Sequence, residues 1–338
     1  MELLTYSSIQ TFKACRKKYF FRYHRNLISK ETPVYFRVGA AIHEGLAAYY
    51  SGYSGEDVNQ KIRSYFQDNI PATSDGVELQ KWDEALELSQ KVFDHYCKMH
   101  PRENDVFLVI DNEKEFSLPI VNPESDRKSQ TFSIAGRIDM VIDLDGNLWI
   151  VEFKTVANIT SAYKRKLTLD NQTLLYIESA ERFSDRPCRG VLYIVISKQV
   201  PRPPELLKRG GLSQAKNQIT TPELYLTAIN NYGLDVADYA DFLGYLETNR
   251  REFFYLEYLT FSEAEREEWR HELWDIARDI RECEIKERWY RNTSQCIPLG
   301  GGTCPYFDIC TAPDQEAIIE MSYRIEPPHS ELNSEKEG

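Results

Sequence analysis

The stretch GRIDMVIDLDGNLWIVEFKT, residues 136–155, decides the fold because it reads as two strands joined by a tight turn. Asp145-Gly146 supplies the residue types that adopt the positive φ angles of a two-residue hairpin loop. Around this turn, from residue 131 to residue 155, the pattern has a period of two and is rich in β-branched and aromatic residues. The sequence therefore predicts a β-hairpin in this stretch.

The predicted turn fixes which residues of the hairpin lie opposite each other. If Leu144 pairs with Asn147, counting outward places Asp139 across from Glu152 on the same face. Their Cβ atoms would lie roughly 4.5 to 5.5 Å apart, where two like charges destabilise a sheet. A divalent cation between the carboxylates would remove that repulsion. Lys154 falls on the same face, and the opposite, buried face carries Trp149, Val151 and Phe153.

This pair of carboxylates with a neighbouring ammonium suggests a specific chemistry. Carboxylate oxygens are hard ligands suited to Mg²⁺ or Mn²⁺, and the Lys154 ammonium could hold a water for attack on phosphorus. The pattern thus outlines a phosphodiester hydrolase. The alternative is that Asp139 and Glu152 are only the polar side of an edge hairpin.

Outside the hairpin, the residue pattern indicates an α/β core wrapped by helices from both ends. We expect a single domain over residues 1–324, with a core at about 100–200, helical wrapping at 1–99 and 221–324, and a disordered tail at 325–338. The expected helices are 6–26 opened by Ser7 or Ser8, 38–50, 77–99, 170–183, one capped by Thr221 and a long one after the Ser262–Glu265 capping box; the further strands are 106–118 and 191–196, and 198–220 is a loop.

The net charge of −12 argues against a protein that coats nucleic acid through bulk electrostatics. A nucleic-acid site would have to be a local basic groove, for which the cluster around Arg16, Lys17 and Lys18 and the run 164–166 are candidates. Each could equally be a solvated helix face. No window approaches the roughly 18 apolar residues of a membrane span, so we expect a soluble, intracellular protein without a membrane partner.

Seven cysteines in an intracellular chain make metal ligation a more plausible special role than a disulfide framework. Cys296, Cys304 and Cys310 cluster near the carboxyl end, and Cys15 lies near the amino end. Their spacing is wider than in most structural zinc sites, so iron–sulfur binding, zinc binding and coincidence remain equal alternatives on spacing alone. Packing roles are expected for Cys97, Cys188 and Cys283.

Asp139 followed after twelve residues by Glu152-Phe153-Lys154 resembles the core motif of PD-(D/E)XK nucleases. The RecB-like branch of that superfamily adds a histidine on an earlier helix and a glutamine and tyrosine on the following helix, matched here by His43, Gln172 and Tyr176. The resemblance implies a restriction-endonuclease-like mixed sheet flanked by helices. It further implies that Asp139, Glu152, His43 and the Phe153 carbonyl bind the metal, that Lys154 orients the nucleophile, and that Gln172 and Tyr176 support Lys154 or the scissile strand.

The cysteines extend the resemblance to AddB-type nucleases and to the iron–sulfur nucleases of CRISPR adaptation. These place one cysteine before the nuclease core and three after it, which implies that Cys15, Cys296, Cys304 and Cys310 ligate a [4Fe-4S] cluster joining the two helical extensions. Seven residues separate Cys296 from Cys304 where many relatives have two, so Cys283 is the substitute candidate.

The resemblance as a whole implies a metal-dependent deoxyribonuclease, specifically an exonuclease acting from DNA ends in recombination, repair or phage DNA metabolism. It would bind single-stranded or duplex ends through Arg16, Lys17 and Lys18 and work with a helicase or recombination protein in the cytoplasm of a bacterial or phage-infected cell. A catalytically silent iron–sulfur module that binds DNA in a recombination complex is the alternative. A zinc-stapled α/β protein unrelated to nucleic acid is a third interpretation.

Overall fold

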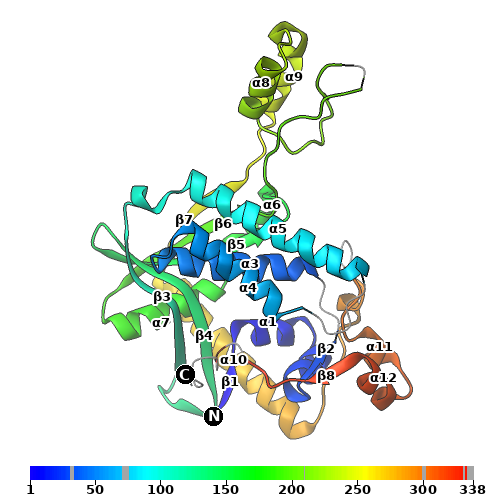
Figure 1. Ribbon diagram of the computed structural model, residues 1–338. Helices are drawn as coiled ribbons and strands as arrows, with labels where there is room; N and C mark the ends of the chain where they lie inside the picture. The colour runs from blue at the N-terminus through cyan, green and yellow to red at the C-terminus, as the bar shows by residue number, and fades with distance from the viewer. Residues whose placement is uncertain (31–33, 71–75, 209, 299–301, 330–331, 333–338) are drawn as a thin grey trace.

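The computed structural model describes residues 1–30, 34–70, 76–208, 210–298, 302–329 and 332 (Figure 1). Its centre is a six-stranded mixed sheet in the order β1-β4-β5-β6-β7, with β3 also paired to β4. The strands are β1 (Glu2–Leu4), β3 (Leu108–Val121), β4 (Lys128–Leu144), β5 (Asn147–Val156), β6 (Cys188–Ser197) and β7 (Phe254–Leu259). The β1–β4 and β5–β6 pairs are parallel and the others antiparallel, which confirms the predicted mixed sheet.

The β4–β5 hairpin has the predicted register and lies inside the sheet. Leu144 pairs with Asn147, and Asp145 and Gly146 have φ angles of 52° and 78°. β4 is bordered by β1 and β3, and β5 by β6, so the hairpin is not at an edge. The edge position assumed in the alternative for Asp139 and Glu152 is therefore wrong.

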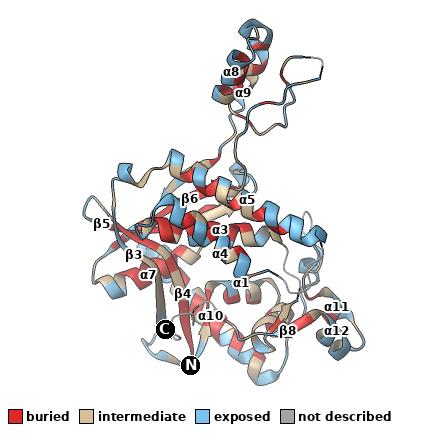
Figure 2. Ribbon diagram, viewed as in Figure 1, coloured by how far each residue is buried: buried red, intermediate tan, exposed pale blue. Residues whose placement is uncertain are grey.

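Helices cover both faces of the sheet (Figure 1), and the buried residues concentrate on the strands between them (Figure 2). One face packs against α3 (Val34–Tyr50), α4 (Gly55–Asp68) and α5 (Gly76–Met99). The other packs against α1 (Tyr6–Ala14), α7 (Gln172–Ser184) and α10 (Glu263–Lys286). Successive residues of β5 enter opposite clusters, Ile150 one and Val151 the other, because strand side chains alternate.

The amino-terminal helix is shorter than expected. Cys15 has extended backbone angles and divides residues 6–26 into α1, α2 (Arg16–Tyr19) and a π-helical turn, Phe20–His24. The N-cap is Thr5, not Ser7 or Ser8: the Thr5 side chain accepts from the Ser8 N–H and the Ser8 hydroxyl accepts from the Thr5 N–H. This reciprocal capping box satisfies two backbone groups at once. Helix α4 was not predicted.

The two ends of the chain form a second, two-stranded sheet. β2 (Leu27–Ser29) pairs antiparallel with β8 (Tyr323–Ile325), beside α11 (Phe307–Thr311) and α12 (Gln315–Ser322). The Tyr306 hydroxyl donates to the Leu27 carbonyl at 2.7 Å, so the carboxyl-terminal segment is fastened to the amino-terminal one. Of the expected tail, Ile325 belongs to β8, and residues 330–331 and 333–338 lie outside the described residues.

The helices α8 (Pro222–Asn231) and α9 (Ala240–Thr248) stand away from the sheet instead of wrapping it (Figure 1). They form a separate apolar cluster with the preceding loop, whose buried members include Leu212, Tyr225 and Phe242. Their apolar faces bury each other, and this packing accounts for the difference from the expected wrapping. In the described part of the chain, no helix combines the length and apolar character needed to cross a membrane.

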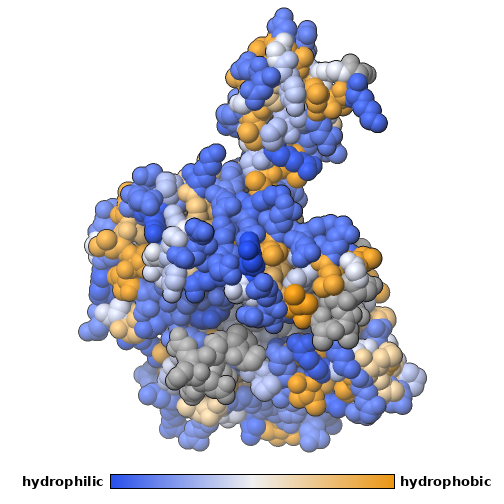
Figure 3. All heavy atoms as spheres, viewed as in Figure 1, coloured by the Kyte–Doolittle hydropathy of each residue, from blue (hydrophilic) through white to orange (hydrophobic). Residues whose placement is uncertain are grey.

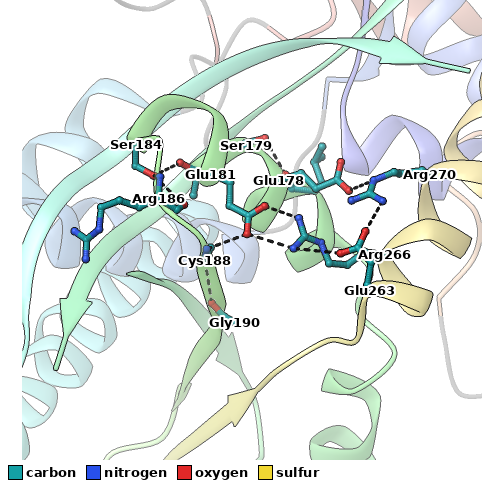
Figure 4. Close-up of polar contacts among 12 residues, drawn as sticks. Glu178, Ser179, Glu181, Ser184, Arg186, Cys188, Gly190, Glu263, Arg266 and Arg270 are labelled. Atoms are coloured by element: carbon teal, nitrogen blue, oxygen red, sulfur yellow. Dashed lines mark hydrogen bonds and ion pairs between the residues drawn. The ribbon is translucent and has the colours of Figure 1, made fainter. Parts of the chain in front are cut away.

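Helix α7 is fastened to α10 by ion pairs that bridge the two helices (Figure 4). Arg266 of α10 donates from both terminal nitrogens to the Glu181 carboxylate, which also accepts the Cys188 N–H at 2.9 Å. One turn away on each helix, the Arg270 Nε lies 2.6 Å from a carboxylate oxygen of Glu178. These contacts hold α7, the helix immediately before β6, against α10.

We expect Arg266→Met to lower the free energy of unfolding by about 1–3 kcal/mol, because it leaves the Glu181 carboxylate partly buried without its main partner. Urea unfolding measures this. Replacing Glu181 by Met in the same chain should recover part of the loss. Arg278→Met is the matched control, since Arg278 and Asp275 are 66% and 61% exposed and should contribute less than about 0.5 kcal/mol. Equal effects of the Arg266 and Arg278 replacements would show that the ion pairs between α7 and α10 do not stabilise the fold.

Candidate active site

The candidate site lies where β4 and β5 separate. Their pairing ends at Met140 and Val151, and one residue further the Asp139 carboxylate accepts the Phe153 N–H at 2.8 Å. On the same side of β4, β1 pairs only as far as Ile134. Asp139 therefore lies in the unpaired part of β4 between these two strand pairings. The neighbouring helices supply further candidate side chains, His43 from α3 and Gln172 and Tyr176 from α7.

Glu152 has an unusual environment for a carboxylate. The residue is 4% exposed; its Oε1 lies 2.7 Å from the Lys154 ammonium, and its Oε2 is buried without a hydrogen-bond partner among the described residues. Burial, and then the charge of Asp139, raise the pKa of Glu152. A buried, unpaired carboxylate oxygen is unfavourable unless it gains a proton or a cation. The geometry therefore fits a cation ligand.

Lys154 is surrounded by acceptors. Its ammonium bonds to Glu152, lies 2.9 Å from the Gln172 Oε1 and is 3.6 Å from an Asp170 oxygen. Burial lowers the pKa of Lys154, but Glu152 and Asp170 outweigh it and raise the pKa above its ordinary value. An ammonium held in this way keeps its proton, so Lys154 is suited to positioning a nucleophile or stabilising negative charge rather than acting as a general base.

Helix α7 packs against the hairpin and adds two side chains, Gln172 and Tyr176, to the hydrogen bonds around Lys154. The Gln172 amide donates to the Tyr176 hydroxyl at 2.6 Å while its carbonyl accepts from Lys154. The glutamine and tyrosine are one helical turn apart, as the sequence pattern requires. The chain Tyr176, Gln172, Lys154, Glu152 is thus continuous, and it fixes the orientation of the lysine.

His43 approaches the site from α3, with its Nδ1 3.5 Å from Asp139 Oδ2. Burial lowers the pKa of His43, but the charge and hydrogen bond of Asp139 together with the charges of Glu152 and Glu113 outweigh it, so the net pKa is raised. One turn earlier, Gly39 lets α3 pack closely on β5: a Cβ there would lie 2.8 Å from the Thr155 Oγ1. This close approach places the imidazole beside the carboxylates.

Two further acidic residues join the site: Asp170, which the sequence had not assigned to it, and Glu113, which with Glu115 was one of two strand residues that the sequence left undecided. Asp170 lies beside the Lys154 ammonium, and its place two residues before Gln172 could have suggested this. Glu113 has a φ of 53° and lies opposite Asp139, between the pairs that Asn112 and Lys114 form with β4. Burial, offset in part by Arg137, raises the pKa of Glu113 to about 7.

The four cysteines proposed as cluster ligands line one small cavity of about 40 Å³. Cys15 comes from the break between α1 and α2, and its sulfur accepts the Asn292 N–H at 3.3 Å. Cys304 donates its N–H to the Cys296 carbonyl at 2.8 Å. The substitute candidate, Cys283, is instead buried in the apolar cluster under the sheet, as expected for a packing residue. The cavity members are Cys15, Cys296, Cys304 and Cys310.

Neither group of side chains is arranged as a finished metal site. Among the residues that the structure describes, no three His, Cys, Asp or Glu side chains already fit around a metal ion. The acidic hairpin offers an unpaired buried oxygen on Glu152, and the cysteines offer a shared cavity. The unpaired oxygen of Glu152 therefore supports binding of a divalent cation at the hairpin. For the cysteines, the only support is that their side chains line the same cavity.

The amino-terminal basic residues lie by the cysteine cavity. The Arg16 guanidinium is 2.9 Å from an Asp279 oxygen and stacks over the rings of Phe12 and Tyr290. Lys17 lies over the Phe20 and Phe21 rings, and burial lowers its pKa. Lys18 lines the cavity together with Lys17. Arg16 and Lys17, which were predicted to bind DNA, thus both have partners within the fold.

Comparison with known proteins supports the family suggested by the hairpin. No curated protein matches the chain. The model of the PD-(D/E)XK nuclease superfamily matches residues 3–311, a range that includes α3, the hairpin, α7 and all four cysteines of the cavity. Members of this superfamily are in general nucleases that hydrolyse phosphodiester bonds. The match covers nearly the whole chain, so the protein belongs to the PD-(D/E)XK nuclease superfamily.

Proposed function

We propose that this protein is a Mg²⁺- or Mn²⁺-dependent deoxyribonuclease that degrades DNA from its ends. The observation that carries the proposal is the buried, unpaired Oε2 of Glu152 beside Asp139 and the fixed ammonium of Lys154. A divalent cation would compensate the carboxylates, and the lysine would then be free to interact with the substrate or the attacking water.

In this proposal Asp139, Glu152, His43 and the Phe153 carbonyl hold the cation. When bound, the cation supplies positive charge at the scissile phosphate and lowers the pKa of a bound water. Lys154, held by Gln172, directs its ammonium protons at the nucleophile or a phosphate oxygen. The Tyr176 hydroxyl fixes Gln172 in turn, so a continuous chain of hydrogen bonds joins Tyr176, Gln172, Lys154 and Glu152.

The direct test is cleavage of end-labelled linear DNA, single- and double-stranded, with Mg²⁺, Mn²⁺ or EDTA. Cleavage is expected with either metal and not with EDTA. A covalently closed circular single strand should resist, because an exonuclease needs an end. Cutting of the circle would replace exonuclease by endonuclease action. DNA binding without cleavage under any metal would support the catalytically silent module instead.

We further propose that Cys15, Cys296, Cys304 and Cys310 bind a [4Fe-4S] cluster. The support is their common cavity, the N–H donated to the Cys15 sulfur, and the resemblance to iron–sulfur nucleases. A cluster would link the break after α1 to the carboxyl-terminal segment, and so stabilise the fold by constraining the unfolded chain. A chain with such a cluster would belong in a reducing compartment such as the cytoplasm, where a helicase or recombination protein would be the partner.

A further inference from the structure

Residues 198–253, here called the arm, leave the sheet after Ser197 at the end of β6 and return at Phe254, the start of β7. The arm contains its own apolar cluster, to which α8 and α9 contribute. Figure 3 shows it set apart from the body and joined to it by a narrow neck. The arm is therefore a packed projection rather than a loose insertion.

The root of the arm lies at the edge of the sheet that carries the candidate active site. β5 and β6 run parallel, with Lys154 opposite Val195, so the arm begins only three residues beyond the level of the catalytic lysine. The Lys198 N–H donates to the Val156 carbonyl at 2.7 Å. The polypeptide strands of the arm thus rise directly beside the end of β5.

Polar contacts hold this neck in place. The Arg251 guanidinium donates to the Gln199 side chain at 2.8 Å, which joins the outgoing and returning strands. Lys164 of α6 (Ser161–Leu167), the helix that follows β5, bonds to Glu252 at 2.7 Å. The position of the arm relative to the site is therefore constrained from both sides.

Charge is segregated within the arm. The loop 198–220 has five basic residues and one acidic residue, whereas residues 221–248 have five acidic residues and no basic one. The whole chain carries −12, so this loop departs in sign from the protein around it. The basic residues of the loop are Lys198, Arg202, Lys208, Arg209 and Lys216, of which Arg209 lies outside the described residues.

Three of these cations face solvent. Arg202, Lys208 and Lys216 are exposed, and no carboxylate pairs with any of them in the described parts of the chain. Lys216 lies 4.9 Å from the centre of the Tyr245 ring. Arg16, by comparison, is paired with Asp279. The three exposed cations of the loop can therefore bind a partner molecule.

We infer that Arg202, Lys208 and Lys216 bind the sugar–phosphate backbone of the nucleic-acid strand whose end enters the site. The inference rests on the proposed function, since it names where that substrate is held. Asp139 and Glu152 repel a polyanion, so affinity must come from cations outside the metal site. Arg165 and Lys166 are also exposed, on α6, the helix whose Lys164 bonds to Glu252 at the neck.

The test is the variant Arg202→Gln/Lys208→Gln/Lys216→Gln, with Arg63→Gln/Lys81→Gln/Lys128→Gln as the matched control. Both sets remove one arginine and two lysine charges that are exposed and unpaired in the described chain, and the control sites lie on α4, α5 and β4. Binding of a fluorescent single-stranded oligonucleotide is measured in EDTA over a range of salt concentrations.

The arm variant is expected to bind at least about tenfold more weakly, with a salt slope smaller by about 2, because three phosphate contacts are lost. The control variant should bind as the unmodified protein does. Equal affinities for the two variants would overturn the inference and leave the arm as a site for a protein partner. Since binding in EDTA needs no catalysis, this outcome is distinct from failure of the proposed nuclease activity, which appears as absence of metal-dependent cleavage by the unmodified protein.

Discussion

Glu152→Gln is expected to reduce DNA cleavage by about 10³-fold or more, because the amide keeps the shape of the side chain and removes the charge that a cation requires. The same change should raise the melting temperature of the metal-free protein. The melting temperature should rise because the variant no longer buries an ionised carboxylate that has one unpaired oxygen. Single-turnover cleavage and thermal unfolding in EDTA measure the two effects.

Lys154→Met should also abolish cleavage, but with the opposite effect on stability. Its removal leaves Glu152 and Asp170 without the ammonium that lies between them. Glu257→Gln, on β7 of the same sheet, is the control and should retain both activity and stability. Cleavage at the unmodified rate by folded Glu152→Gln or Lys154→Met protein would remove the hairpin from the active site.

Serine at Cys15 or Cys304 is expected to abolish iron binding and to make the protein less stable and less soluble. Anaerobically purified protein should contain about four irons per chain and absorb near roughly 400 nm, and either serine variant should lose both. Since cluster formation is coupled to folding, the loss releases the two ends of the chain from each other. Iron analysis and thermal unfolding measure these effects.

Cys97→Ser is the control for the cluster, because Cys97 lies on α5 and outside the cysteine cavity. It should keep its iron. Cys296→Ser and Cys283→Ser distinguish the candidates for the fourth ligand, and the cavity favours Cys296. Zinc without iron in the anaerobic protein would refute the cluster. Iron retained in Cys296→Ser but lost in Cys283→Ser would exchange the assignment of these two cysteines.

The hairpin could be predicted because local chemistry determines it. Asp145-Gly146 fixes the turn, and a period of two then determines the face of every residue up to Asp139 and Glu152. His43 and Gln172 could be assigned only through the resemblance to RecB-like nucleases, because taken singly each is an ordinary helix residue. In the structure the His43 Nδ1 lies 3.5 Å from Asp139 and the Gln172 Oε1 lies 2.9 Å from the Lys154 ammonium.

The choice between Glu113 and Glu115, and the position of the arm, lay beyond such reasoning for physical reasons. The pairing register of β3 with β4 places Glu113, and not Glu115, opposite Asp139, and that register includes a shift between Val109 and Asp111. An irregularity of this kind has no signal in the residue pattern, so the sequence left the two glutamates undecided. For α8 and α9, the helical pattern indicates that one face is buried but not what covers it. Here each helix covers the other.

The contact between the chain ends also sets the timing of folding during synthesis. The Ala14 carbonyl accepts its hydrogen bond from Asn292, a residue 278 positions later. At the usual 5–20 residues per second, a ribosome needs roughly 15 to 60 seconds to supply that partner. Throughout this interval Phe21 and Leu27, which are fully covered in the finished protein, lack Tyr306 and Ile309. The nascent amino end therefore keeps this apolar surface uncovered until the carboxyl-terminal segment is made, and products truncated before residue 292 would retain it.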